Sequence, residues 1–158
     1  MMSNHSRLHC RLDRTCYYYC GEITSRDASV YHILFHSKKN KMKPSQWKWN
    51  YPATACISSD SYGYGVSKNY SRDVRDTSYN SKLANHLKST LHVTHLGECS
   101  PLTKCKNGVG RCAEPHAANK TINKTLCSIN DIIFSLALRP RTLQIIPYCD
   151  NCKLTFNL

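Results

Sequence analysis

Three cysteines and one glutamate have the types and the spacing of a metal-dependent hydrolytic site. Cys112 lies two residues before Glu114, and Cys149 and Cys152 form a Cys-x-x-Cys pair further along the chain. Thiolates bind zinc at about 2.3 Å, and a centre with three protein ligands leaves its fourth position open to water. A carboxylate beside that position can accept a proton from the water and pass it on. The pattern therefore predicts that the three cysteines bind Zn²⁺ and that Glu114 is the catalytic acid and base.

Other interpretations of the same residues stay open. A Cys-x-x-Cys pair is also common in structural zinc sites and in redox-active dithiols. His116 follows Cys112 by four residues, and residues four apart lie on one face of a helix. A Cys112–His116 ligand pair is therefore an alternative to the Cys112–Glu114 arrangement.

The residues around these cysteines resemble the cytidine-deaminase-like superfamily. Residues 110–115 read GRCAEP and residues 149–156 read CDNCKLTF. In the superfamily a zinc-binding His or Cys precedes the catalytic Glu by two residues, and a Pro-Cys-x-x-Cys motif follows later in the chain. The residues of these two motifs most resemble those of the YwqJ-like branch, whose members are mostly bacterial-toxin-type deaminases. The resemblance covers about residues 80–158, roughly half of the chain.

The resemblance implies an α/β fold of the cytidine deaminase type, a three-layer α-β-α sandwich built on a small mixed sheet. It implies Zn²⁺ as the cofactor and hydrolysis of a C–N bond, in which hydroxide on the zinc attacks the amine-bearing carbon of cytosine and yields uracil. Glu114 is the proton shuttle in this scheme. Tyr148, His116 and His95 are the candidates for contact with the substrate base.

Two departures from the family pattern bear on this expectation. Tyr148 stands where the family has proline, with Pro147 one residue earlier. Only six residues follow Cys152, so we expect the domain to close its sheet differently or to be truncated at its C-terminus. A truncated fold favours a second hypothesis, a non-catalytic zinc-stabilised module that binds nucleic acid. A third hypothesis is a cysteine-rich secreted interaction protein.

The charge of the chain favours a polyanionic partner. Lysine and arginine number 22 against 10 acidic residues, and the formal net charge is +12 at pH 7. Such an excess is typical of proteins that bind nucleic acid. A base inside a duplex must be flipped out at a cost of about a few kcal/mol, which favours single-stranded DNA or RNA as the substrate. If the protein is a toxin, we also expect an immunity protein as a partner.

Cysteine content and hydropathy bear on the compartment. Ten cysteines would suit a secreted disulfide protein. However, the first thirty residues lack the apolar core of a signal peptide, and there is no run of about 18 apolar residues to predict a membrane span. We therefore expect no membrane association and an intracellular site of action, in the cytoplasm or nucleus, with delivery as a toxin as a further route.

The pattern divides the chain into residues 1–77, a basic extension rich in Cys and Tyr, and residues 78–158, the deaminase-like domain. One group of residues in the extension matches no strong zinc spacing: His5, His9, Cys10, Cys16 and Cys20. Aromatic residues alternate after a basic run at Trp47, Trp49 and Tyr51, which fits base stacking and a half-buried strand equally well. Residues 58–75, rich in Ser, Gly and Tyr, predict a loop or linker.

Apolar periodicity predicts the first elements of the deaminase-like domain. Leucines at four-residue steps predict an amphipathic helix over residues 81–91 with Ser81 as its N-cap. A strand is expected over residues 91–96. The loop that follows contains Cys99 and Cys105, which could pair with each other or lie near the metal.

The elements that carry the site come next. Residues 112–120 predict a helix with Pro115 in its first turn, where a missing N–H is tolerated. Residues 128–138 predict a second helix after a Ser cap. Residues 142–146 predict a short buried strand that delivers the Cys-x-x-Cys pair. The family fold needs a hairpin before Cys112, and only one of its two strands is visible in the sequence.

Overall fold

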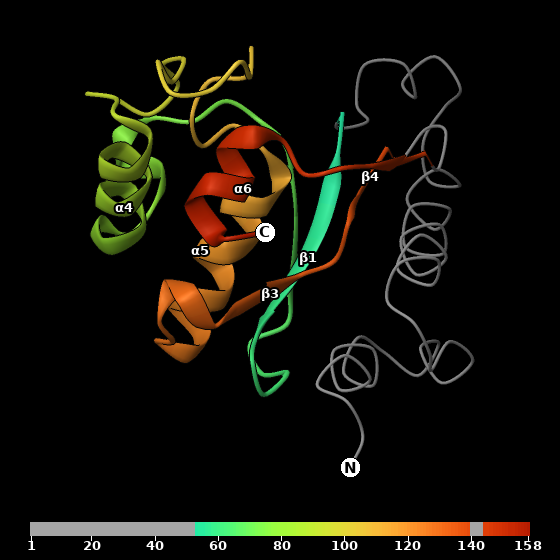
Figure 1. Ribbon diagram of the computed structural model, residues 1–158. Helices are drawn as coiled ribbons and strands as arrows, with labels where there is room; N and C mark the ends of the chain where they lie inside the picture. Colours follow the sequence, from blue (N-terminus) through green and yellow to red (C-terminus); the bar gives the residue numbers. More distant parts are fainter. Residues whose placement is uncertain (1–52, 140–143) are drawn as a thin grey trace, which may run out of the picture.

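Figure 1 shows the computed structural model of the chain, which describes residues 53–139 and 144–158. The predictions for the histidines and cysteines near the start of the chain, and for Trp47, Trp49 and Tyr51, lie outside these residues. The described residues form a sheet of five short strands and three α-helices, so the predicted α/β composition is confirmed. No helix in this part of the chain is long and apolar enough to cross a bilayer.

A β-hairpin forms the first two strands of the sheet. β1 (Ala55–Asp60) and β2 (Ser67–Tyr70) pair antiparallel. The Asp60 carboxylate accepts hydrogen bonds from the backbone N–H groups of Tyr62 and Tyr64, at 3.1 and 2.6 Å, and so closes the turn. The prediction of a loop or linker over residues 58–75 is therefore wrong for these strands.

Amino-acid composition did not predict this hairpin, because β1, the strand in the middle of the sheet, contains polar residues that are buried. All six residues of β1 are buried. Ser58 Oγ lies 2.7 Å from Thr121 Oγ1, and Ser59 Oγ donates to the Asp60 carbonyl at 2.8 Å. A buried hydroxyl with a hydrogen-bond partner avoids most of the desolvation penalty. Serines that predict a loop from composition can therefore occupy the middle of a sheet.

All the strand pairs in the described residues are antiparallel. β1 has β2 on one side and β3 (Ile132–Phe134) and β4 (Ala137–Leu138) on the other, and β4 pairs with β5 (Ile145–Ile146). The prediction of a mixed sheet is wrong for this part of the chain. The chain enters β3 opposite the end of β1, with Asp60 facing Ile132, so it must run back along β1.

Three helices lie on one side of the sheet (Figure 1): α4 (Ser81–Leu91), α5 (Ala113–Thr125) and α6 (Asp150–Phe156). α5 packs directly on β1 and β2, and α4 packs on α6. The three-layer sandwich stays a prediction, because residues 53–139 and 144–158 place helices on this side alone. The predicted domain boundary at residues 77/78 also stays a prediction, although β1 and β2 on its N-terminal side contact α5 on its C-terminal side.

α4 confirms the helix predicted over residues 81–91, with its leucines buried against the core. Its N-cap is Asn80 rather than Ser81, since Asn80 Oδ1 accepts a hydrogen bond from the Leu83 N–H at 2.9 Å. Asparagine caps helices as well as serine does. A short 3₁₀ helix, η2 (Asp76–Ser78), leads from β2 into α4. α5 confirms the helix predicted from residue 112 and continues to Thr125.

Three other predictions need correction. The chain leaves α4 through His92 at φ 52° and then turns, so the strand over residues 91–96 is wrong. Residues 128–138 form a 3₁₀ helix, η3 (Ile129–Asp131), and then β3 and β4, because β-branched isoleucines pair well with β1. Of the buried strand expected over residues 142–146, only Ile145 and Ile146 are seen as a strand. Ile145 is 40% exposed, and residues 140–143 are outside the described part.

Candidate metal centre

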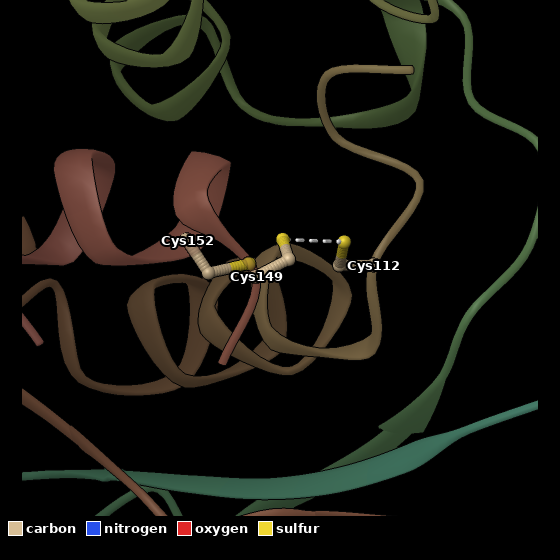
Figure 2. A group of neighbouring side chains, drawn as sticks. All are labelled: Cys112, Cys149 and Cys152. Atoms are coloured by element: carbon tan, nitrogen blue, oxygen red, sulfur yellow. Dashed lines mark hydrogen bonds between the residues drawn. The ribbon is translucent and has the colours of Figure 1, made fainter. Parts of the chain in front are cut away.

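The three predicted cysteine ligands converge in space. The sulfurs of Cys112, Cys149 and Cys152 all lie within 4.8 Å of one another, and those of Cys112 and Cys149 are 3.3 Å apart. Figure 2 shows the three side chains gathered at one point. A tetrahedral ion with metal–sulfur bonds of about 2.3 Å needs its sulfurs about 3.8 Å apart. The group therefore has the dimensions to hold a metal ion.

Two helix N-termini place these sulfurs. Cys112 is the N-cap of α5 and Cys149 is the N-cap of α6, and both have extended backbone angles. Neither side chain makes a capping hydrogen bond, which leaves both sulfurs available to a metal. Cys152 lies in the first turn of α6. The positive end of a helix dipole stabilises a thiolate, so both helices favour the metal-binding form of these cysteines.

α6 is held in place by contacts with the rest of the core. The Phe156 and Phe134 rings lie 4.7 Å apart between centroids. His86 Nε2 hydrogen-bonds to the Thr155 carbonyl at 2.8 Å, which ties α6 to α4. These contacts orient the Cys-x-x-Cys turn toward the start of α5.

Glu114 lies at the sulfur cluster. It is 4% exposed, and its Oε2 accepts a hydrogen bond from Cys152 Sγ at 3.6 Å. Burial raises the pKa of Glu114 above that of an ordinary glutamate, because the charged form loses its hydration. The carboxyl group can therefore hold a proton at a higher pH than an exposed glutamate can.

The three thiols share their negative charge unequally. Hydrogen bonds from Cys112 and Cys152 hold the pKa of Cys149 well below its usual range. The hydrogen bond with Cys149 raises the pKa of Cys112, hydrogen bonds with Cys112 and Cys149 raise the pKa of Cys152, and burial raises both further. The cluster thus carries its first negative charge on Cys149. A divalent cation would be needed to hold three thiolates so close together.

His116 lies apart from the sulfur cluster. Its Nε2 is 3.3 Å from the Arg72 carbonyl oxygen, and its ring meets the Tyr79 ring edge-on at 5.1 Å. Burial lowers the pKa of His116 to about 4, so the ring is neutral at neutral pH. In the part of the chain that is described, the potential metal ligands that come together are the three cysteines, without His116.

The other two predicted substrate contacts take different positions. Tyr148 directly precedes Cys149, is half-buried against the core, and donates a hydrogen bond from its hydroxyl to the Phe134 carbonyl at 3.2 Å. His95 is exposed, and its Nδ1 lies 2.6 Å from Asp76 Oδ2. A role in substrate binding stays a prediction for these residues.

Asn151 and Cys105 also lie near the site, although the sequence gives little indication of a role for either. Asn151, between Cys149 and Cys152, is 3% exposed and hydrogen-bonds to the loop that contains Cys105. A buried asparagine inside a Cys-x-x-Cys pair cannot be told from an exposed one by spacing. Cys105, which the sequence allowed to lie near the metal, is on this loop and so lies beside the start of α6.

Comparison with known proteins yields no relative: no family model, curated protein or solved structure matches the chain. The resemblance to the deaminases therefore rests on the motif residues. The function has to be argued from the chemistry of the site itself.

Proposed function

We propose that the protein is a zinc-dependent deaminase that converts cytosine to uracil in single-stranded nucleic acid. One observation carries this proposal: three cysteine sulfurs lie within 4.8 Å of one another, and the buried Glu114 carboxylate is 3.6 Å from one of them. Zinc deaminases that act on bases can bind the ion through three thiolates, and they have a glutamate beside the ion that is not a ligand.

The donor set fits zinc better than the hard cations. Thiolates favour soft and borderline metals, whereas calcium and magnesium prefer oxygen ligands. Cys112, Cys149 and Cys152 would hold the ion. Bound zinc would supply the Lewis acid that brings the pKa of a water molecule close to neutral.

Glu114 has the environment of a group that moves protons. Burial raises its pKa above that of an exposed glutamate, a shift toward the range that suits a general acid and base. It would take a proton from the attacking water and return it, first to the ring nitrogen and then to the leaving ammonia. Its hydrogen bond with Cys152 supports this role, because a metal held by the three cysteines would lie close to the carboxylate.

Basic residues on the elements around the centre support a polyanionic substrate. Arg111 directly precedes Cys112 and is exposed, as is Arg72. Lys104 and Lys106 are exposed on the loop that is hydrogen-bonded to Asn151. Together with the net charge of +12, they favour contact with phosphates.

A substitution at Glu114 tests the proposal. Purified protein with one zinc per chain should form uracil in a single-stranded cytosine oligonucleotide. We expect Glu114→Gln to keep the zinc and to lower the rate by about 10²- to 10⁴-fold, the usual contribution of a general acid and base. Glu98→Gln, which alters an exposed glutamate, is the control and should retain activity. Equal rates for Glu114→Gln and wild type would refute the proposal.

The burial of the site favours a second candidate, a non-catalytic zinc module. Glu114 is 4% exposed and Cys152 is 2% exposed, as expected where a metal serves only to link two helices. This candidate predicts one zinc per chain and nucleic-acid binding without ammonia release. Both functions bind the metal, so product formation distinguishes them.

A further inference from the structure

The segment between α4 and α5 contains a loop, residues 97–109, whose two ends are hydrogen-bonded to each other. Gly97 and Val109 mark its neck: the Gly97 N–H donates to the Val109 carbonyl at 2.9 Å, and the Val109 N–H donates to Glu98 O at 2.7 Å. At Gly108 a Cβ atom would lie 2.1 Å from the Gly97 carbonyl oxygen, so only glycine allows this close approach. The loop between is therefore held at both ends.

Asn151 fastens the middle of this loop to the Cys-x-x-Cys turn. Thr103 Oγ1 donates a hydrogen bond to Asn151 Oδ1 at 2.6 Å, and Asn151 Nδ2 donates to the Asn107 carbonyl at 3.0 Å. The two anchored residues stand two positions before and two positions after Cys105. A single buried side chain thus holds the loop on both sides of Cys105, through the Thr103 hydroxyl and the Asn107 carbonyl.

The anchored loop brings a fourth thiol to the centre. The hydrogen bonds of Asn151 place Cys105, which is half-buried, beside the start of α6, where Cys149 is the N-cap. It is not one of the three sulfurs that lie within 4.8 Å of one another. Cys105 is therefore a neighbour of one metal ligand and stands outside the group that would hold the ion.

We propose that Cys105 is a resolving thiol that forms a reversible disulfide with Cys149 when a hydroperoxide oxidises the centre. The Cys149 thiolate attacks the peroxide and becomes a sulfenic acid, and the peroxide's other oxygen leaves as water after taking up a proton. The Cys105 sulfur then attacks the sulfenic sulfur, a second water leaves, and the S–S bond forms. Two sulfurs lose one electron each, and the peroxide gains both. The centre loses one ligand and releases its metal.

Cys112 and Cys149 are the half-buried ligands that a peroxide can reach, and of these two Cys149 starts the helix to which the Cys105 loop is hydrogen-bonded. Cys152 is 2% exposed, whereas Cys149 and Cys105 are half-buried and reach solvent. Cys112 lies 3.3 Å from Cys149 and is the rival partner. A bound ion would hold Cys112, whereas Cys105 stands outside the group of three sulfurs, so Cys105 would be the thiol free to attack. This proposal depends on the metal site of the proposed function, but not on deamination.

Peroxide treatment of the full zinc-loaded chain tests the disulfide. We expect hydrogen peroxide to release zinc, and dithiothreitol with added zinc to restore one zinc per chain. Trypsin cleaves after Lys104, Lys106 and Arg111, so Cys105 and Cys112 leave on separate peptides. Mass spectrometry of the unreduced digest should link the Cys105 peptide to Cys149. A link between Cys112 and Cys149 instead would overturn the proposal.

Variants distinguish formation of a disulfide by Cys105 from oxidation of Cys149 alone. In Cys105→Ser, peroxide should still release zinc, but Cys149 should proceed to the sulfinic acid, and dithiothreitol should restore little binding. Cys127→Ser, which removes a half-buried cysteine outside the cluster, is the control and should recover as wild type does. Full recovery by Cys105→Ser would show that Cys105 does not resolve the oxidised ligand.

Cobalt substitution shows whether Cys105 is itself a ligand. The sulfur-to-cobalt charge-transfer band should have the same intensity in wild type and Cys105→Ser, because the proposal places Cys105 off the ion. A weaker band in the variant would make Cys105 a ligand and overturn the proposal. A wild-type chain that binds no zinc would overturn this proposal and the proposed function together. Zinc binding without uracil formation would overturn only the deaminase.

Discussion

The pKa values of side chains around the metal centre are shifted in different directions by their immediate surroundings. Hydrogen bonds from two thiols favour the Cys149 thiolate, whereas burial raises the pKa of Glu114 and lowers that of His116. The neutral His116 ring is used in packing against Tyr79. The centre thus combines a sulfur whose pKa is lowered with a carboxyl group whose pKa is raised, the pairing that suits metal binding and proton transfer.

At the scale of single residues, the His95–Asp76 pair predicts how stability depends on pH. The hydrogen bond with Asp76 raises the pKa of His95, and the same bond lowers the pKa of Asp76. The pair therefore contributes its full stability between the ordinary pKa values of 3.8 and 6.5. This contribution is lost as pH rises through the raised pKa of His95 or falls through the lowered pKa of Asp76. We expect the stability difference between wild type and His95→Ala, measured by urea unfolding, to shrink on both sides of that window.

High salt provides the control for this pair, since the His95 side chain is largely exposed, the Asp76 side chain is partly exposed, and salt screens such charges. The pH dependence should weaken when the unfolding series is repeated at 1 M salt, where the Debye length is about 3 Å. A stability difference that stays constant with pH would contradict the assignment.

At the scale of elements, the metal centre is an arrangement of helix starts. α5 and α6 both begin at a cysteine with an extended backbone, and the turn of each helix directs its residues toward the shared point (Figure 2). α4 packs on α6 and ends near the loop that carries Cys105. The stability of α4 therefore contributes to the placement of the Cys-x-x-Cys turn.

Removal of the α4 cap tests this element. Asn80 Oδ1 accepts from the Leu83 N–H, so Asn80→Ala leaves that backbone donor without its side-chain partner. We expect a loss of about 1 kcal/mol in the free energy of unfolding, the usual cost of deleting an N-cap. Asn80→Ser, which can cap in the same way, should lose much less, as judged by urea denaturation. Equal losses in the two variants would show that the cap does not stabilise α4.

At the scale of the whole molecule, the metal centre joins parts that are distant in sequence. Cys112 and Cys149 are 37 residues apart, and a bound ion would close the chain between the starts of α5 and α6. Cys152 and Phe156 of α6 belong to the hydrophobic core. Metal binding therefore couples to folding, because the unfolded chain has no preformed site.

Metal removal tests this coupling. At a metal concentration about 1,000 times Kd, binding stabilises a fold by about 4 kcal/mol. We therefore expect chelation of zinc under reducing conditions to lower Tm by roughly 10 °C. Addition of zinc should restore Tm in wild type, but not in Cys152→Ser, which lacks one sulfur. A Tm that is insensitive to chelation would mean that the ion adds nothing to folding.

The sequence by itself determined the features that depend on near neighbours. The leucines of α4 recur within one or two turns, and the Cys-x-Glu and Cys-x-x-Cys spacings lie within the first turn of a helix. Helical contacts join residues three or four apart, so a local pattern is enough to predict them. Each half of the sulfur cluster is such a local motif, and the resemblance to the deaminases implied that the two halves share one ion.

Tertiary structure alone decided the features whose partners are far along the chain. Ser135 Oγ accepts from the Ile57 N–H across 78 residues, and Thr121 partners Ser58, so a serine-rich segment became the middle of the sheet. The isoleucines of β3 pair with β1 in place of forming a helix. Likewise, Asn151 brings Cys105 to Cys149 through two hydrogen bonds. Strand pairing and loop anchoring depend on partners that no local spacing specifies.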